Sequence, residues 1–245
     1  MKRKEVEDNI ILVALTGSIA YGLNIATSDI DYRGIFIAPK DYQLGLHTIE
    51  QKDSGWLVEL GNGCYPYLTN KDTCCFELKK YLKLALNCNP NILEILFCNK
   101  HKHLNEAGQT LVDNKHLFLS KKAKHSYAGY AQSELRKMQN PNSTKYNASV
   151  GYNTKKGMHV IRLLTMGIEI LKHNTIIVNR KEAGDQDYLL SIRNGEVPLK
   201  DLLSKAEDLQ DILNKEYTSS SIQSKPNYEK VNRLCISLIH NHIEK

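Results

Sequence analysis

The first apolar run of the chain predicts a buried strand. Residues Ile10–Thr16 (IILVALT) are mostly aliphatic and rich in β-branched side chains. A short run of this kind between polar flanks is typical of a strand in a protein core, and it is too short to span a membrane. After a polar interval, residues 32–37 (YRGIFI) predict a second strand.

Farther along the chain, apolar residues recur at the spacing of an amphipathic helix. In residues 77–88 the apolar set is Leu78, Tyr81, Leu82 and Leu86, which places these side chains on one side of a helix. Similar patterns predict helices over residues 91–97, 126–139, 149–173, 186–193, 199–214 and 227–242.

The remaining pattern predicts a mixed fold. Residues 47–60 resemble an extended hairpin, and short strands are expected over residues 72–76 and 175–178. Strands followed by helices predict an α/β fold of the α+β type, in which a head with a mixed sheet precedes a mainly helical C-terminal region. We place the head domain at residues 1–120 and the helical region at residues 121–245.

Composition and charge restrict the class of protein. The chain has 245 residues, 41% of them hydrophobic, which is enough for one large domain or two small ones. Its 33 basic and 27 acidic residues give a net charge of +6. This balance favours a polyanionic partner such as RNA, DNA or a nucleotide, although ordinary solubility explains it equally well.

The cysteines and the start of the chain predict a cytoplasmic protein with no membrane association. None of the six cysteines lies in a Cys-x-x-Cys spacing, so a zinc site is not expected and reduced thiols are the simplest interpretation. The first residues (MKRKE) are charged and the apolar run after them is short, unlike a signal peptide or an anchor.

The stretch between the two predicted strands carries the candidate chemistry. Gly17 permits a tight turn after the first strand, and Ser18 can cap a short helix. Backbone N–H groups at such a turn, together with the Ser18 hydroxyl, would offer hydrogen-bond donors to phosphate oxygens. The sequence therefore predicts a nucleotide-binding turn at Gly17 and Ser18.

Two carboxylates follow the turn at a spacing of two residues. On an extended backbone, Asp29 and Asp31 would project to the same face, where carboxylates can bridge two metal ions about 3.5–4 Å apart. Oxygen-only ligation suits Mg²⁺. An isolated Asp-x-Asp is more often a pair of solvated acids in a turn, but the Gly-Ser turn and the two flanking strands favour a metal site.

These motifs resemble the signature of the DNA polymerase beta superfamily of nucleotidyltransferases, which is Gly-Ser, a spacer, then Asp-x-Asp. More narrowly, the chain is similar to predicted nucleotidyltransferases associated in some genomes with RNA ligase and RNA repair. Their pattern is Gly-Ser-x-Ala-Tyr-Gly followed by Ser-Asp-x-Asp-x-Arg-Gly, and it is matched here by Gly17, Ser18, Ala20, Tyr21, Gly22, Ser28, Asp29, Asp31, Arg33 and Gly34. The resemblance continues through residues 89–91, 94–97, 152–164 and 189–195.

The resemblance implies a polymerase-beta-like head and a third carboxylate. This acid helps to hold the metal or takes a proton from the attacking hydroxyl. Asp72, just before the helix predicted at residue 77, is our choice, with Glu59 and Glu77 as alternatives. Asp29, Asp31 and Asp72 would then be the catalytic acids and the ligands of Mg²⁺ or Mn²⁺.

The resemblance also implies a group of phosphate-binding residues in the helical region. Lys156, His159 and Arg162 are spaced three apart and would lie along one broad side of a helix. From spacing alone, a solvated basic face is the simpler interpretation. The family carries an acid shortly before this group, where this chain has Asn153. Arg33 could orient Asp29, reach a phosphate or pair with a surface acid.

Together these features predict a metal-dependent nucleotidyltransferase. It would transfer a nucleoside monophosphate from a nucleoside triphosphate (NTP) to an acceptor hydroxyl and release pyrophosphate. RNA is the expected acceptor. A protein side chain, as in AMP-adding enzymes, and a small molecule are the alternatives, and a nucleotide- or RNA-binding module without turnover is the non-enzymatic one.

Overall fold

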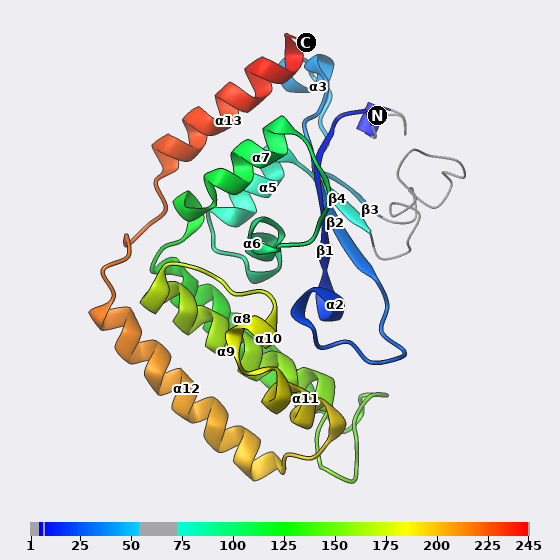
Figure 1. The fold of residues 1–245 in the computed structure, drawn as a ribbon, viewed down its shortest axis with the longest axis vertical. Helices are drawn as coiled ribbons and strands as arrows, with labels where there is room; N and C mark the ends of the chain where they lie inside the picture. The colour runs from blue at the N-terminus through cyan, green and yellow to red at the C-terminus, as the bar shows by residue number, and fades with distance from the viewer. Residues whose placement is uncertain (1–4, 7, 54–72, 245) are drawn as a thin grey trace. The chain divides into compact units, whose positions relative to one another are not determined.

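The structure is a computed structural model that describes residues 5–6, 8–53 and 73–244. The chain divides into two compact units (Figure 1). Unit 1 comprises Met1–Leu86, Asn91–Phe118 and Asn227–Lys245, and unit 2 comprises Asn87–Pro90 and Leu119–Pro226. The division predicted from sequence, at residues 120 and 121, lies close to the boundary after Phe118. It differs in the last segment, which belongs to unit 1.

Unit 1 is built on a five-stranded mixed sheet. The strand order is β3-β4-β2-β1-β5, in which β2 and β4 run parallel and the other neighbours run antiparallel. β1 is buried along its whole length, as its aliphatic sequence predicts. The strands are β1 Ile10–Thr16, β2 Asp31–Phe36, β3 Gln51–Asp53, β4 Cys74–Glu77 and β5 His101–Leu104.

Helices cover one face of this sheet (Figure 1). The last helix of the chain, α13, contacts α5 in the same unit, and Val231 and Leu238 are its buried residues. The helices of unit 1 are α2 Gly17–Tyr21, α3 Lys40–Leu44, α5 Leu78–Ala85, α6 Pro90–Phe97, which begins in unit 2, α7 Glu106–Asp113, the 3₁₀ helix η2 Lys115–Phe118, and α13 Tyr228–Ile243.

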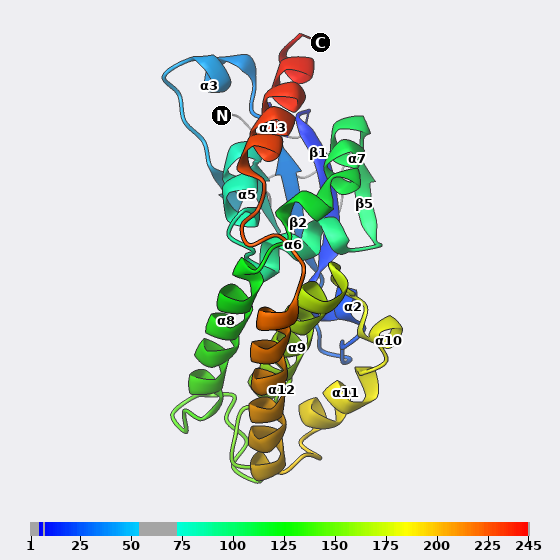
Figure 2. The same ribbon diagram turned by 90° about the vertical axis from the view of Figure 1, so that its left-hand side faces the viewer.

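Unit 2 is helical and centred on α9, which contacts α8, α11 and α12 (Figure 2). Gly157 fits the close approach of α9 and α12, because a Cβ there would lie 2.8 Å from Leu202 Cδ2 and the leucine would have to shift. The helices are α8 Lys122–Met138, α9 Thr154–His173, α10 Arg180–Ala183, α11 Gln186–Asn194 and α12 Leu199–Ser219.

The fold class predicted from sequence is confirmed: a mixed sheet with helices, followed by a mainly helical region. One predicted strand is wrong. Residues 175–178 are extended but form no strand, because the backbone N–H of Ile177 donates to the Glu169 carboxylate at 3.0 Å rather than to a neighbouring strand. The hairpin predicted over residues 47–60 lies partly outside the described residues; its described strand, β3, pairs with β4. None of the helices in the described part of the chain is long and apolar enough to cross a membrane.

Candidate active site

The Gly-Ser turn lies at the end of the buried strand β1. Gly17 has a φ of 68°, in the left-handed region that glycine adopts without steric cost. The short helix α2 begins at this residue and ends at Gly22, which is also left-handed with a φ of 69°. Two glycines therefore bracket one helical turn that carries Ser18.

Asp31 lies directly against this turn. It pairs with Thr16 in the β1–β2 register, and the Thr16 hydroxyl donates to the Asp31 carbonyl at 3.3 Å. A Cβ at Gly17 would clash with the Asp31 carboxylate oxygen Oδ2 and would lie 2.9 Å from its Cγ. Gly17 thus leaves the space that the Asp31 carboxylate occupies, and the sheet register brings the two halves of the motif together.

Asp29 is exposed and precedes β2, which begins at Asp31. Before it, the Ser28 hydroxyl accepts a hydrogen bond from the Ile25 backbone N–H at 2.8 Å, and the Ser28 N–H donates to the Ile25 carbonyl at 2.9 Å. This closed turn leads the chain from α2 back to the sheet. Sequence spacing predicted Asp29 and Asp31 on one strand; only Asp31 is in the strand itself.

Buried contacts below the turn hold α2 in place. Tyr21 is 4% exposed, and its hydroxyl donates to the carboxylate of Glu94 in α6, which is 3% exposed. Arg33, two residues after Asp31 in β2, donates from Nη1 to the Tyr32 carbonyl at 2.9 Å. Tyr21 is therefore part of the core of unit 1, and the motif rests on packed secondary structure.

The third carboxylate stays a prediction. Asp72, like its alternative Glu59, lies outside the described residues. Glu77 is buried and caps α5, because its Oε2 accepts from the Lys79 N–H at 2.7 Å and its Oε1 accepts from Gln43 at 2.9 Å. Within the described residues, no group of three or more His, Cys, Asp or Glu side chains could hold a metal ion.

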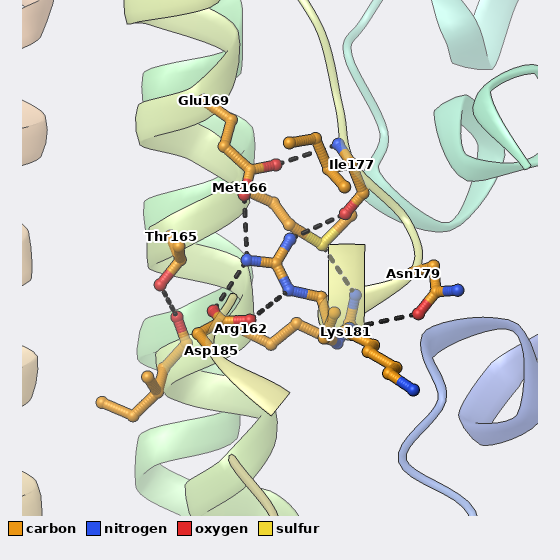
Figure 3. Close-up of polar contacts among 10 residues, drawn as sticks. Arg162, Thr165, Met166, Glu169, Ile177, Asn179, Lys181 and Asp185 are labelled. Atoms are coloured by element: carbon orange, nitrogen blue, oxygen red, sulfur yellow. Dashed lines mark hydrogen bonds and ion pairs between the residues drawn. The ribbon is translucent and has the colours of Figure 1, made fainter. Parts of the chain in front are cut away.

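The predicted phosphate-binding residues lie on α9 in unit 2. Asn153 caps this helix by accepting from the Lys156 N–H at 3.2 Å, so the residue that replaces the family's acid has a structural use. Arg162 is 2% exposed, and its Nη1 donates to the sulfur of Met166 at 3.1 Å (Figure 3). Its Nη2 lies 3.5 Å from His159 Nδ1. The structure brings Arg162 and His159 together.

Lys156 faces a different partner. Its ammonium lies 2.6 Å from Oε2 of Glu134 in α8, a carboxylate that is 3% exposed and also accepts from Lys137 at 2.9 Å. Burial opposes ionisation of Glu134, but hydrogen bonds from Lys156 and Lys137 lower its pKa from the ordinary value. Lys156 therefore joins α9 to α8 by an ion pair.

Positive charge accumulates around His159. Burial lowers the pKa of His159 well below its ordinary value, and nearby positive charges lower it further. These charges belong to Arg162, Lys156, Lys155 and Arg193. Arg193, in α11, was missed from sequence, because only the packing of α11 on α9 brings it near His159.

Arg180 is a second buried arginine in unit 2, and it is fully paired. It is completely buried, and its guanidinium donates to the Asp185 carboxylate at 2.9 and 2.7 Å, to the Ile177 carbonyl at 2.7 Å and to Glu169 at 2.9 Å (Figure 3). Burial alone would lower the pKa of Arg180, but the hydrogen bonds and charges of Asp185 and Glu169 raise it. This network ties α9 to the segment that leads into α11.

A comparison with protein families identifies the family to which this chain belongs. The model of RlaP, the RNA repair pathway DNA polymerase beta family, matches residues 1–237 of the 245. The chain belongs to this family. Its name indicates a DNA polymerase beta-like nucleotidyltransferase linked to RNA repair. Searches of curated proteins and of solved structures found no match.

Proposed function

We propose that the protein is a metal-dependent nucleotidyltransferase that moves a nucleoside monophosphate from an NTP to an acceptor hydroxyl and releases pyrophosphate. The observation that carries the proposal is the Asp31 carboxylate held against Gly17, the first residue of the Gly-Ser turn. Membership in a polymerase beta family supports it. In this arrangement a carboxylate and a turn that would bind phosphate lie at the same end of the neighbouring strands β1 and β2.

The donor atoms of Asp29 and Asp31 fit a hard divalent cation. Both residues offer only carboxylate oxygens, which Mg²⁺ prefers and which Mn²⁺ also accepts. We assign the metal to Asp29 and Asp31, with Asp72 as the third ligand. A bound pair of such ions would neutralise charge on the triphosphate and on the attacking and leaving oxygens.

The chain's own residues would bind and orient the substrate. The turn at Gly17 and Ser18 would donate hydrogen bonds to phosphate oxygens, and we propose that Arg33 in β2 also contacts a phosphate. Basic side chains on α9, in unit 2, would make charge-assisted hydrogen bonds to a phosphate group. The acceptor oxygen would bond to the α-phosphorus as the bond to pyrophosphate breaks, and a carboxylate, for which we propose Asp72, would take the hydroxyl proton.

RNA is the acceptor that the observations favour. The family is linked to RNA repair by its name, and the net charge of +6 suits a polyanion. A free hydroxyl at an RNA end would be the attacking group. Protein side chains and small molecules are the competing acceptors, and they are outcomes of the test below.

The test is transfer of label from four α-³²P NTPs, each with Mg²⁺ or Mn²⁺, to RNA oligonucleotides, mixed tRNA or protein. We expect label on RNA together with pyrophosphate release. Label on protein would mean that a protein is the acceptor. Pyrophosphate release only with an added small-molecule hydroxyl would mean that the acceptor is a small molecule. NTP binding without transfer under any of these conditions would contradict the proposed activity and indicate a binding module.

A further inference from the structure

Arg193 lies in α11, just before the last residue of that helix, and α11 contacts α9 within unit 2. Its guanidinium atoms Nε and Nη1 are shielded from solvent, and neither donates a hydrogen bond to any described residue. A shielded donor without an acceptor lowers the stability of the folded state, because it has lost its hydrogen bonds to water. The folded protein therefore keeps an arginine at this position at an energetic cost.

The contrast with Arg180 shows what a structural arginine in this unit looks like. Arg180 has two carboxylates and a carbonyl around its guanidinium, and these groups raise its pKa. Burial lowers the pKa of Arg193 from its ordinary value. Arg180 and the partly buried Arg193 thus have opposite electrostatic environments, and only that of Arg180 is explained by folding.

The surroundings of Arg193 add positive charge. His159 lies near enough to Arg193 for the arginine charge to lower its pKa, and Arg162 Nη2 lies 3.5 Å from His159 Nδ1. Glu134 in α8, the carboxylate paired with Lys156 of α9, already accepts hydrogen bonds from two lysines. The charges of two guanidinium groups therefore act on one imidazole, and an anion would offset them.

We propose that Arg193, with Arg162 and His159, forms a binding site for a phosphate group. Arginine forks match the oxygens of phosphate in geometry and charge, and a neutral imidazole can add one hydrogen bond. The proposal deepens the proposed function and rests on it for the source of the phosphate: the NTP or a phosphorylated RNA end. It replaces Lys156, which Glu134 holds, with Arg193 as the second cation of the site.

The test measures binding of sodium tripolyphosphate to the full chain without divalent metal, by calorimetry and by the ligand-induced rise in Tm. In Arg193→Gln we expect Kd to weaken by about ten- to a hundredfold, the effect of losing a hydrogen bond to a charged group. Without ligand, the Tm of Arg193→Gln should equal or exceed that of the wild type, because two shielded donors without acceptors have been removed. Arg136→Gln is the matched control: Arg136 is an exposed arginine in unit 2, and binding should not change.

Two results would overturn the proposal. One is an unchanged Kd for tripolyphosphate in Arg193→Gln. The other is a lower Tm without ligand, the mark of a structural arginine like Arg180. Arg193→Lys, which keeps the charge but loses the fork, should bind with intermediate affinity.

Arg193→Gln also distinguishes the two possible sources of the phosphate. If the site holds the nucleotide, Arg193→Gln weakens binding of ATP; if it holds an RNA end, the variant weakens binding of 5′-phosphorylated RNA and leaves 5′-hydroxyl RNA unchanged. Binding of tripolyphosphate is measured without transfer. A wild type that transfers no label but binds tripolyphosphate through Arg193 would therefore contradict the proposed transferase and leave this site standing.

Discussion

At the scale of single residues, the candidate site depends on contacts between positions distant in sequence. The pattern Gly-Ser then Asp-x-Asp predicted the candidate residues, and the register of β1 with β2 explains how Asp31 meets Gly17. The partners of Lys156 and the setting of Arg193 were not predictable. They depend on how α8 and α11 pack against α9, and periodicity along one helix carries no information about that packing.

Gly17→Ala should damage both stability and activity. Its methyl group would meet the Asp31 carboxylate, and the φ of 68° is strained for alanine by about 1–2 kcal/mol. We expect a lower Tm and loss of most transfer activity. Gly129→Ala is the control: it lies in α8 with open space around it and should gain about 0.5–1 kcal/mol. Equal activity in the two variants would show that the close approach of Asp31 is irrelevant.

His159 makes stability depend on pH. The unfolded chain protonates this histidine near pH 6.5, whereas the folded chain holds its pKa well below that value. Below about pH 6.5 the unfolded state therefore binds more protons than the folded state. As the pH is lowered through this range, the free energy of unfolding falls by up to about 1.4 kcal/mol per pH unit. His159→Gln should flatten this loss between pH 6.5 and 5 in urea unfolding. An identical pH profile in the variant would mean that His159 is not held neutral.

At the scale of secondary structure, the sequence predicted most helices and the central strands. β1 was predicted with its observed bounds, because a fully buried aliphatic strand has a strong signal. β5 (HKHL) and α7 were missed: β5 is polar, and it is a strand because it pairs with β1. The error at residues 175–178 has the opposite cause. The segment is apolar, but the backbone N–H of Ile177 donates to the Glu169 carboxylate and not to a neighbouring strand.

The Arg180 network should be essential for the α9–α10–α11 arrangement. Arg180→Gln would leave Asp185 and Glu169 without their buried cation, and breaking a buried ion pair costs about 3–5 kcal/mol. Urea unfolding of this variant should show that loss, whereas Lys181→Gln, at an exposed neighbour in α10, should stay within about 0.5 kcal/mol of the wild type. A similarly small effect of Arg180→Gln would exclude a stabilising role for the network.

At the scale of the whole molecule, the candidate residues divide between the two units. The Gly-Ser turn and its aspartates belong to unit 1, and the arginines with His159 belong to unit 2. The sequence placed the turn and the aspartates in residues 1–120 and the basic residues of α9 in residues 121–245. It did not predict that α13 would join unit 1, because the apolar stripe of a helix does not specify which partner it covers.

The most direct test of the central claim compares label transfer by four proteins: wild type, Asp29→Asn, Asp31→Asn and Asp8→Asn. The first two variants keep the shape of the side chains but lose the charge that would hold a metal, whereas Asp8 is an exposed acid in the same unit. The account predicts transfer to RNA by wild type and Asp8→Asn, and a fall of about a hundredfold or more in Asp29→Asn and Asp31→Asn. Undiminished transfer by folded Asp29→Asn and Asp31→Asn would contradict it.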